Sequence, residues 1–412
     1  MAIKRRDFLK SAAAVPGVYA AQSLIPFAVE AADEIVISQI HDQSGGLDIY
    51  GNPMVEAFGL AVDEINAAGG VLGKPMRAIN YDPQSNMQLY AQLAQQAALR
   101  DRVSVVHGGI TSASREVIRP VLRRFNTLYF YNTLYEGGVC DRNTFCLGTT
   151  PAQTVAKLVP YVIERFGPKI YSLAADYNYG QITADWVRKF AQENGGEVVE
   201  TEFFPLDVTD FGPTISKIQA AQPDLVMSIL VGGAHVSFYR QWFASGMKND
   251  IPMASTTFGG GNEHIILTPE EANGIIYACG YFQELDTPAS NRFREALTAK
   301  YGPDHAYMSE LPCATYEGVH IWAKAVEQAG TTERMPVIEA LESGLSFDGP
   351  SGEVIVDAQT HHATRTALLA ECEDRGFKLI EQFPLQPPAD TQAVCDLAAN
   401  PDDNTHYVIS VD

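Results

Sequence analysis

Short apolar runs alternate with longer amphipathic segments along most of the chain. EIVISQI, beginning near Glu34, reads as a buried strand. The next segment predicts a helix capped by Asn52, with Pro53 at its first position and its end at Gly69–Gly70. MRAINYD, VSVVHGG and LYFYN follow as strands, with a helix over residues 84–100 and another after VSVVHGG. This alternation predicts βα units around a parallel sheet.

The same alternation occurs a second time further along the chain. The strands KIYSLAADY, EVVETEFF and DLVMSILVGG are each followed by a helical segment, and PMASTTF is again a strand. Further helices are expected over residues 290–300 and 315–328. The predicted fold class is therefore α/β, with two doubly wound parallel sheets that are each covered by helices on both faces.

The segments after the predicted strands are rich in Gly, Ser, Thr, Tyr and Asn. They are HDQSGGLDIYG, HGGITSAS, YNTLYEGG, ADYNYG, VGGAH and STTFGGG. Ligands of open parallel sheets bind beyond the carboxyl ends of the strands, so these segments are the candidate site. They contain few of the lysines, cysteines and acid–base clusters that catalysis requires. This composition indicates binding rather than reaction.

Motifs of nucleotide binding and of hydrolysis are missing from these segments. Neither GxxxxGK[ST] nor GxGxxG opens a helix. Ser112 lacks the second glycine of a GxSxG nucleophile elbow. The other polar residues are interpreted as isolated. The single acids are Glu136, Asp176 and Glu263, and His235 lies at a helix start. The pair His361-His362 is interpreted as solvated. We therefore expect no catalytic residue, no metal and no cofactor.

The turn HGGITSAS instead suits recognition of a polar group. Ser112 and Ser114 fit a helix N-cap, where free N–H groups attract a carbonyl or carboxylate oxygen. The alternative is that these hydroxyls only cap the helix. Several tyrosines at predicted strand ends would add flat walls for a small planar ligand, or simply pack: Tyr50, Tyr131, Tyr135, Tyr177 and Tyr179.

Composition narrows the range of partners. The chain has 412 residues and a formal net charge of −21. Nucleic acids and anionic membrane surfaces select basic faces, so we expect neither as a partner.

The first residues have the layout of an export signal. A basic start precedes a modestly apolar run, and Lys4-Arg5-Arg6-Asp7-Phe8-Leu9-Lys10 is similar to the twin-arginine motif. We expect residues 1–32 to be a removable signal and the mature protein to be periplasmic. No later run is long enough to span a bilayer.

Six cysteines fit an oxidising compartment. Cys140 and Cys146 flank a short turn, and a Cys372–Cys395 bridge would close a C-terminal loop. Connectivity cannot be read from spacing, so the pairing stays open. Structural disulfides, with some cysteines left free, are favoured over a zinc site because no CxxC occurs.

The run SGG…YG, AVDEINAAGGVLGKP and the following strand resembles the type I periplasmic solute-binding proteins of ABC importers. DYNYG, FGPTISKIQAAQPDLVM and CATYEGVHIWAKAVEQAG fit the same pattern over nearly the whole mature chain. The resemblance implies two lobes joined by three crossings, near Gly148–Pro151, Tyr277–Tyr281 and Phe347–Pro350. It divides the chain into lobe 1 (33–149 and 280–347), lobe 2 (150–279 and 348–382) and a surface tail (383–412).

The turns TSASR and YEG look most like those of urea and short-chain amide binders. In the amino-acid binders, a second-lobe acid that partners the ligand ammonium falls at about Thr257 here. Its replacement favours a neutral ligand, because a buried ammonium would lack its counter-charge. TTPAQT and VGGAH depart from the amide binders as well.

The resemblance implies ligand contacts from both lobes. The expected set is Ser44, Tyr50, Ser112, Thr133 and Tyr135 from the first lobe, and Tyr177, Tyr179, Ala234 and Thr257 from the second. The expected function is capture of urea or a short amide and its delivery to an ABC permease by a monomeric protein. The alternatives are a binding protein for branched-chain or other amino acids or small organic acids, an amide-sensing regulator, and a secreted hydrolase.

Overall fold

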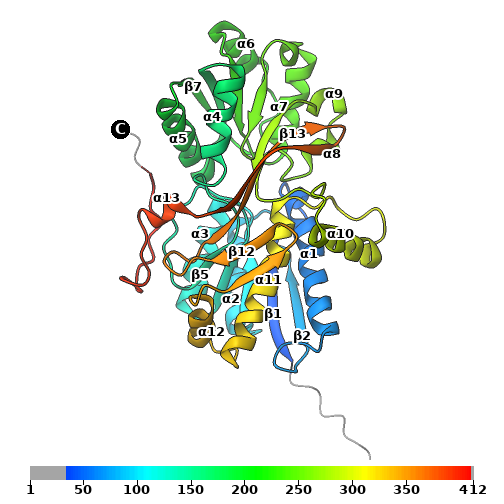
Figure 1. The fold of residues 1–412 in the computed structure, drawn as a ribbon, viewed down its shortest axis with the longest axis vertical. Helices are drawn as coiled ribbons and strands as arrows, with labels where there is room; N and C mark the ends of the chain where they lie inside the picture. The colour runs from blue at the N-terminus through cyan, green and yellow to red at the C-terminus, as the bar shows by residue number, and fades with distance from the viewer. Residues whose placement is uncertain (1–33, 410–412) are drawn as a thin grey trace, which may run out of the picture. The chain divides into compact units, whose positions relative to one another are not determined.

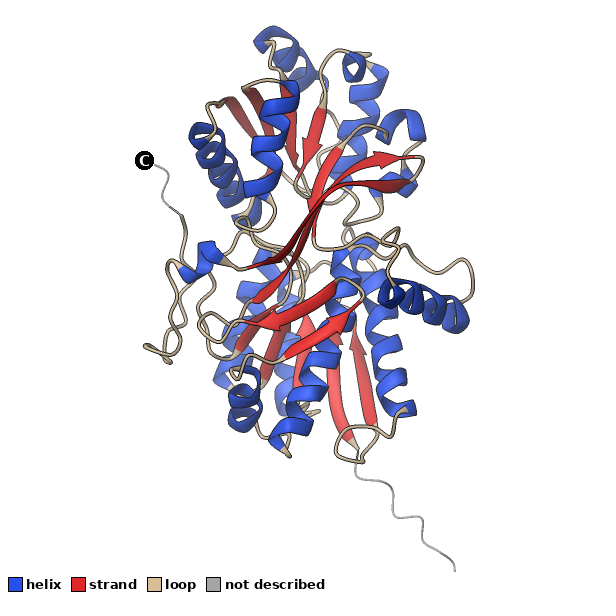
Figure 2. Cartoon of the chain, viewed as in Figure 1, coloured by secondary structure: helices blue, strands red, loops and turns tan. Residues whose placement is uncertain are grey.

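Residues 34–409 are described by a computed structural model of the chain. The predicted signal peptide lies outside these residues. A parallel five-stranded sheet and a nine-stranded sheet of parallel and antiparallel strands, each flanked by helices, organise the described part of the chain (Figures 1 and 2). We call the parts built around them the first and the second lobe.

The first lobe contains a five-stranded parallel sheet with the order β2-β1-β3-β4-β5. Its strands are β1 (Ile35–Ile40), β2 (Met76–Tyr81), β3 (Val105–Gly108), β4 (Leu128–Tyr131) and β5 (Thr144–Cys146). Its helices are α1 (Asp48–Ala67), α2 (Met87–Leu99), α3 (Ser112–Arg124), α10 (Pro288–Tyr301), α11 (Glu310–Ala329) and α12 (Arg334–Leu341). Buried aliphatic and aromatic side chains of β1, α1, α11 and α12 form one core cluster.

The second lobe contains parallel strands β6 to β10 and, beside them, antiparallel strands. The strands are β6 (Lys169–Ala175), β7 (Glu197–Phe204), β8 (Leu225–Ile229), β9 (Met253–Ser255), β10 (Ile276–Cys279), β13 (Ala363–Glu373) and β14 (Gly376–Gln386). The helices are α4 (Val155–Phe166), α5 (Asn178–Glu193), α6 (Gly212–Ala221), α7 (Gly233–Ala244), η1 (Met247–Asn249), α8 (Glu263–Ile266) and α9 (Pro269–Ala272). The predicted α/β class with parallel sheets in two lobes is confirmed.

Helix α1 begins earlier than its sequence predicts. It starts at Asp48 after Leu47, so Pro53 lies inside the helix and Asn52 is not its cap. Proline lacks one backbone N–H, which a helix tolerates best near its start. Burial of the Tyr50, Met54 and Phe58 side chains outweighs this local signal.

The third passage between the lobes differs from the expected one. Phe347–Pro350 falls at the hairpin of β11 (Ser346–Gly349) and β12 (Gly352–Val356), where Gly349 faces Gly352. Val354, Val356 and Ala363 pack in the core cluster of the first lobe. The chain passes between the lobes along β13, which pairs with β12 at one end and with β10 at the other (Figure 1).

A buried ionic network joins the three passages. The Glu310 carboxylate accepts the N–H of Thr149 and that of Gly280, both at 2.7 Å. On the third passage, Arg365 donates to the Leu147 carbonyl and forms an ion pair with Glu317 at 3.2 Å. Glu310, Glu317 and Arg365 are fully buried. We call these three residues the hinge network.

The tail is more structured than the sequence indicates. Phe383 to Gln386 complete β14, and α13 (Ala389–Gln392) follows. A disulfide joins Cys140 to Cys395. Cys146, Cys279, Cys313 and Cys372 are free and buried. Neither short-range pairing occurs, because Cys146 and Cys372 point into two separate core clusters.

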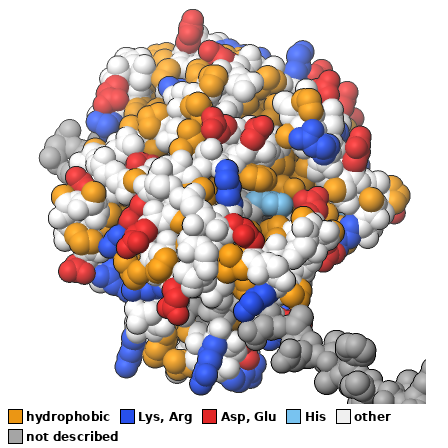
Figure 3. Space-filling model, turned by 60° about the horizontal axis from the view of Figure 1, so that its bottom comes forward, with side chains coloured by type: hydrophobic (Ala, Val, Ile, Leu, Met, Phe, Trp, Pro, Cys, Tyr) orange, Lys and Arg blue, Asp and Glu red, His pale blue; other side chains and the backbone are white. Residues whose placement is uncertain are grey.

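Acidic and basic side chains are interspersed on the face shown in Figure 3, with apolar side chains between them. Residues 34–409 contain no helix with the length and apolarity that a membrane span requires.

Arg365→Met should destabilise the protein by about 3–5 kcal/mol, because it leaves the buried carboxylate of Glu317 without its cation. Arg188→Met is the control, since Arg188 pairs with Asp185 at the surface and should contribute less than about 1 kcal/mol. Urea denaturation followed by circular dichroism measures both. Equal, small losses would contradict a structural role for the hinge network.

Candidate ligand-binding site

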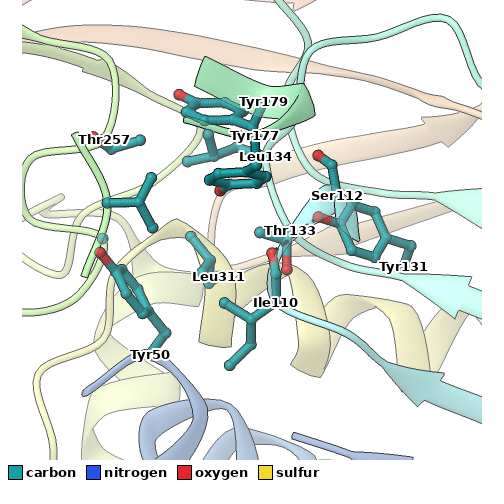
Figure 4. Close-up of a pocket in the computed structure, with 12 residues that line it drawn as sticks. Tyr50, Ile110, Ser112, Tyr131, Thr133, Leu134, Tyr177, Tyr179, Thr257 and Leu311 are labelled. Atoms are coloured by element: carbon teal, nitrogen blue, oxygen red, sulfur yellow. Dashed lines mark hydrogen bonds between the residues drawn. The ribbon is translucent and has the colours of Figure 1, made fainter. Parts of the chain in front are cut away.

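A cavity lies where the carboxyl ends of the strands of both lobes meet. The first lobe contributes Ile110 and Ser112 after β3 and Thr133 and Leu134 after β4. The remaining lining residues are Tyr50, Tyr131, Tyr177, Tyr179, Val231, Thr257, Gly260 and Leu311 (Figure 4). The strand-end rule thus located the segments that form this cavity.

Most of the predicted contact residues line the same cavity. They are Tyr50, Ser112, Thr133, Tyr177, Tyr179 and Thr257. The other three lie elsewhere. Ser44 is exposed and donates to Asp82 at 2.7 Å, Tyr135 is buried behind the wall against His362, and Ala234 is buried at the start of α7.

Six of the lining residues are not among the predicted contacts. Tyr131 was among the strand-end tyrosines, and Ile110, Leu134, Val231 and Gly260 lie within or next to the predicted segments. Leu311 had no local signal in the sequence, because it does not follow a predicted strand. It lies at the start of α11, next to the hinge-network residue Glu310.

The space left between these side chains is small, about 30 Å³. At about 10–15 Å³ per water-sized sphere, this space holds roughly two or three waters. A larger solute therefore requires the two walls to separate or the lining side chains to move.

The N-terminus of α3 forms one end of the cavity. Thr111, not Ser112 or Ser114, is the N-cap, and its hydroxyl accepts the Ser114 N–H at 3.1 Å. The N–H groups of Ser112 and Ala113 have no acceptor within the helix, as in the first turn of any helix. The positive end of the helix dipole favours an anionic group at this position.

A buried ion pair supports this helix end from behind. Arg115 donates to Glu136 at 2.9 Å, and its guanidinium lies over the rings of Tyr131 and Tyr135. The Ser112 hydroxyl donates to the same carboxylate. Burial alone would raise the pKa of Glu136, but Arg115, His406 and Ser112 lower it to about 2. Glu136, expected to be isolated, therefore belongs to a charged cluster.

A second buried cluster lies at the other end of the cavity. Glu263 accepts from the Gly259 and Gly261 N–H groups and pairs with His235 at 3.2 Å. The other ring nitrogen of His235 lies 3.0 Å from the Thr257 hydroxyl. His235 and Glu263, which we interpreted as separate residues, form one unit. His361 and His362 are likewise buried rather than solvated.

Most cavity hydroxyls already donate to protein acceptors. Tyr131 donates to the Ile110 carbonyl at 2.9 Å, Thr133 to that of Gly109 at 3.2 Å, and Thr257 to that of Leu230 at 2.8 Å. Their lone pairs and rings remain for a ligand.

Hydrogen bonds also cross the cleft directly. Tyr50 of the first lobe donates to Glu263 at 3.1 Å and accepts the Gly232 N–H at 2.9 Å. Trp186 of α5 donates to the Glu136 carbonyl at 3.1 Å. These bonds hold the lobes together around the cavity.

The comparison with protein families identifies the architecture. Residues 35–389 match the family model described as "Periplasmic binding protein domain". The chain belongs to the periplasmic binding protein family. Proteins of this family bind small molecules for transporters and are not enzymes.

Two relatives of this periplasmic binding protein are distant in sequence. The leucine-, isoleucine-, valine-, threonine- and alanine-binding protein of Pseudomonas aeruginosa is 25% identical over 352 residues, covering 82% of this chain and 91% of the relative. Leu/Ile/Val-binding protein homolog 6 of Brucella melitensis is 23% identical over 294 residues, covering 70% of this chain and 75% of the relative.

Solved structures share the fold. A solute-binding protein of an ABC transporter from R. palustris, in complex with 4-hydroxybenzoate, has a TM-score of 0.77 and 23% identity, covering 86% of this chain and 98% of that one. The branched-chain amino acid binding protein of Streptococcus pneumoniae, in complex with isoleucine, has a TM-score of 0.74 and 23% identity, covering 86% and 100%.

Tyr50→Phe should shift the unliganded protein toward an open form, because it removes two hydrogen bonds between the lobes, one of them to a carboxylate. Such a charged bond contributes about 1.5–3 kcal/mol. Small-angle X-ray scattering should show a larger radius of gyration than for the wild type. Tyr301→Phe is the control, since Tyr301 bonds to the Glu56 carbonyl within the first lobe. An unchanged radius for Tyr50→Phe would refute the role of this contact.

Proposed function

We propose that this periplasmic binding protein serves an ABC importer and captures a small carboxylate that has an apolar, flat or branched body. The cleft closes over this solute and the protein delivers it to the permease as a monomer. Ligand binding to both walls favours the closed arrangement.

One observation carries the proposal: Ser112, the first residue of α3, lines a cavity walled by tyrosine rings and aliphatic side chains (Figure 4). The helix end suits a carboxylate, and the rings suit an aromatic or branched body. The complexes of the R. palustris and Streptococcus pneumoniae proteins support this ligand class.

Urea or a short amide, the ligand expected from TSASR and YEG, fits this cavity less well. Such a molecule has few carbons to cover the apolar wall. A neutral ligand is also less favoured, because the buried acid Glu263 bonds to Tyr50 and reaches Thr257 through His235, although position 257 is not acidic. The Pseudomonas aeruginosa relative is an amino-acid-binding protein, and the R. palustris protein forms a complex with 4-hydroxybenzoate.

An amino acid is the second candidate within this class. Glu263 and Glu136 lie at opposite ends of the cavity, so either could attract an ammonium group. An amide-sensing regulator is less favoured, because the twin-arginine-like start implies export.

A thermal-shift panel tests the ligand class. 4-Hydroxybenzoate, benzoate, leucine and isoleucine are compared with urea and acetamide. A ligand at about a hundred times its Kd should stabilise the protein by about 2.7 kcal/mol. We expect at least one acid to raise the melting temperature and neither amide to do so. Stabilisation by the amides alone would refute the proposal.

Ala113→Asp tests the position of the carboxylate. An acid in the first turn stabilises the helix by about 0.3–1 kcal/mol but competes with a ligand carboxylate for the same N–H groups. We expect calorimetric affinity for the acid to fall at least roughly tenfold, about 1.4 kcal/mol. Ala113→Asn, which has the same shape without the charge, should retain most of the affinity. Equal affinities for both variants would place the carboxylate elsewhere.

A further inference from the structure

The C-terminal residues 387–409, which we call the strap, are bonded to the loop that carries Glu136. The Cys140 N–H donates to the Thr405 carbonyl, and the Tyr407 N–H to that of Gly138, both at 2.8 Å. The Cys140–Cys395 disulfide links the same two segments. The strap is therefore fixed beside the cavity wall by both covalent and backbone bonds.

Arginines of α3 hold the strap from another side. Arg119 donates to the Asn404 carbonyl at 2.7 Å, and Arg123 to that of Asp403 at 2.9 Å. Both arginines also pair with Asp141 at 3.1 Å. The second half of the helix whose first residue lines the cavity thus binds the strap at residues 402–404.

The strap places one side chain on the charged cluster at the cavity. Nε2 of His406 lies 3.2 Å from a Glu136 carboxylate oxygen and 3.2 Å from the Gly137 carbonyl. The Glu136 side chain is fully buried and accepts the Ser112 hydroxyl through its other oxygen. A continuous path of contacts therefore runs from His406 through Glu136 to a residue that lines the cavity.

The strap also contacts the first passage between the lobes. Asp390 accepts the Thr150 hydroxyl at 2.8 Å and the Ala152 N–H at 2.9 Å. Between the strap and α5 lies a second cavity of about 430 Å³, which Glu136 and Trp186 help to line. The Glu136 carbonyl accepts the indole N–H of Trp186, which belongs to the second lobe. The loop that carries Glu136 therefore contacts the strap, the Ser112 hydroxyl and the second lobe.

We propose that the strap is a positioning element of the binding cleft, with His406 as the positioning residue. Through its Nε2 contact, His406 keeps the Glu136 carboxylate on Ser112 and Arg115, where Arg115 neutralises its charge, so that this charge does not oppose an incoming carboxylate. The disulfide keeps His406 in place. The expected effect on affinity rests on the proposed function, whereas the positioning of Glu136 does not.

Affinity measurements test the effect on the ligand. The probe is whichever of 4-hydroxybenzoate, benzoate, leucine and isoleucine binds the wild type most tightly. His406→Ala should bind it roughly tenfold more weakly, the equivalent of one charge-assisted hydrogen bond. His406→Gln retains an N–H donor and should restore most of the affinity. His305→Ala is the control, since the His305 ring bonds to the carbonyl of the adjacent Ala306 and is not part of the strap or the cavity lining.

Rescue by glutamine distinguishes positioning from general stabilisation. Wild-type affinity in His406→Ala, or an equal loss in His406→Ala and His406→Gln, would overturn the proposal.

Hydrogen exchange tests the strap without any ligand. His406→Ala and the double variant Cys140→Ser, Cys395→Ser should both speed amide exchange in residues 111–116 and 132–141. Exchange in β8 should stay at the wild-type rate. Unchanged exchange near Glu136 in both variants would overturn the proposal. If none of the acids binds the wild type, the proposed function fails, and this measurement still decides the role of the strap.

Discussion

The two-lobed arrangement depends on one group of buried charges, the hinge network. Glu310 accepts backbone N–H groups from two passages between the lobes, and Arg365 lies on the third. A buried carboxylate or guanidinium is costly unless it is fully paired, so these contacts specify one arrangement of the three passages. Each lobe has its own core cluster on its side of this network. The cavity forms next to it, because the carboxyl ends of both parallel sheets face the passages.

Each lobe presents a charged cluster to the cavity. In the first, Glu136 is neutralised by Arg115 and held by Ser112. In the second, Glu263 is paired with His235 and reaches across the cleft to Tyr50. Because these polar groups bond to each other, the surface left for a ligand is mostly rings and aliphatic side chains. The first turn of α3 lies at the end of this surface that Ser112 lines. This arrangement explains how a strongly polar framework forms an apolar binding cavity.

Local patterns predicted those parts of the fold that depend on neighbouring residues. The strand EVVETEFF coincides with β7, and the segments after the strands of both sheets line the cavity. Six of the predicted contact residues are among the lining residues, because strand ends in a parallel sheet converge by geometry. Ser44 and Tyr135 show the limit of this rule: both follow a predicted strand, but one bonds outward to Asp82 and the other packs behind the wall. Side-chain direction depends on partners that come from other segments.

The sequence alone determined the α/β alternation, the two sheets and the polar turns at their edges, since these follow from hydrophobic periodicity over a few residues. Only the tertiary structure decided which distant residues meet: Cys140 with Cys395, His406 with Glu136, and Tyr50 with Glu263. The tertiary structure also shows that the third passage runs along β13, not at the predicted Phe347–Pro350. These pairings depend on burying charges and completing two cores at once, and no local spacing encodes such long-range constraints.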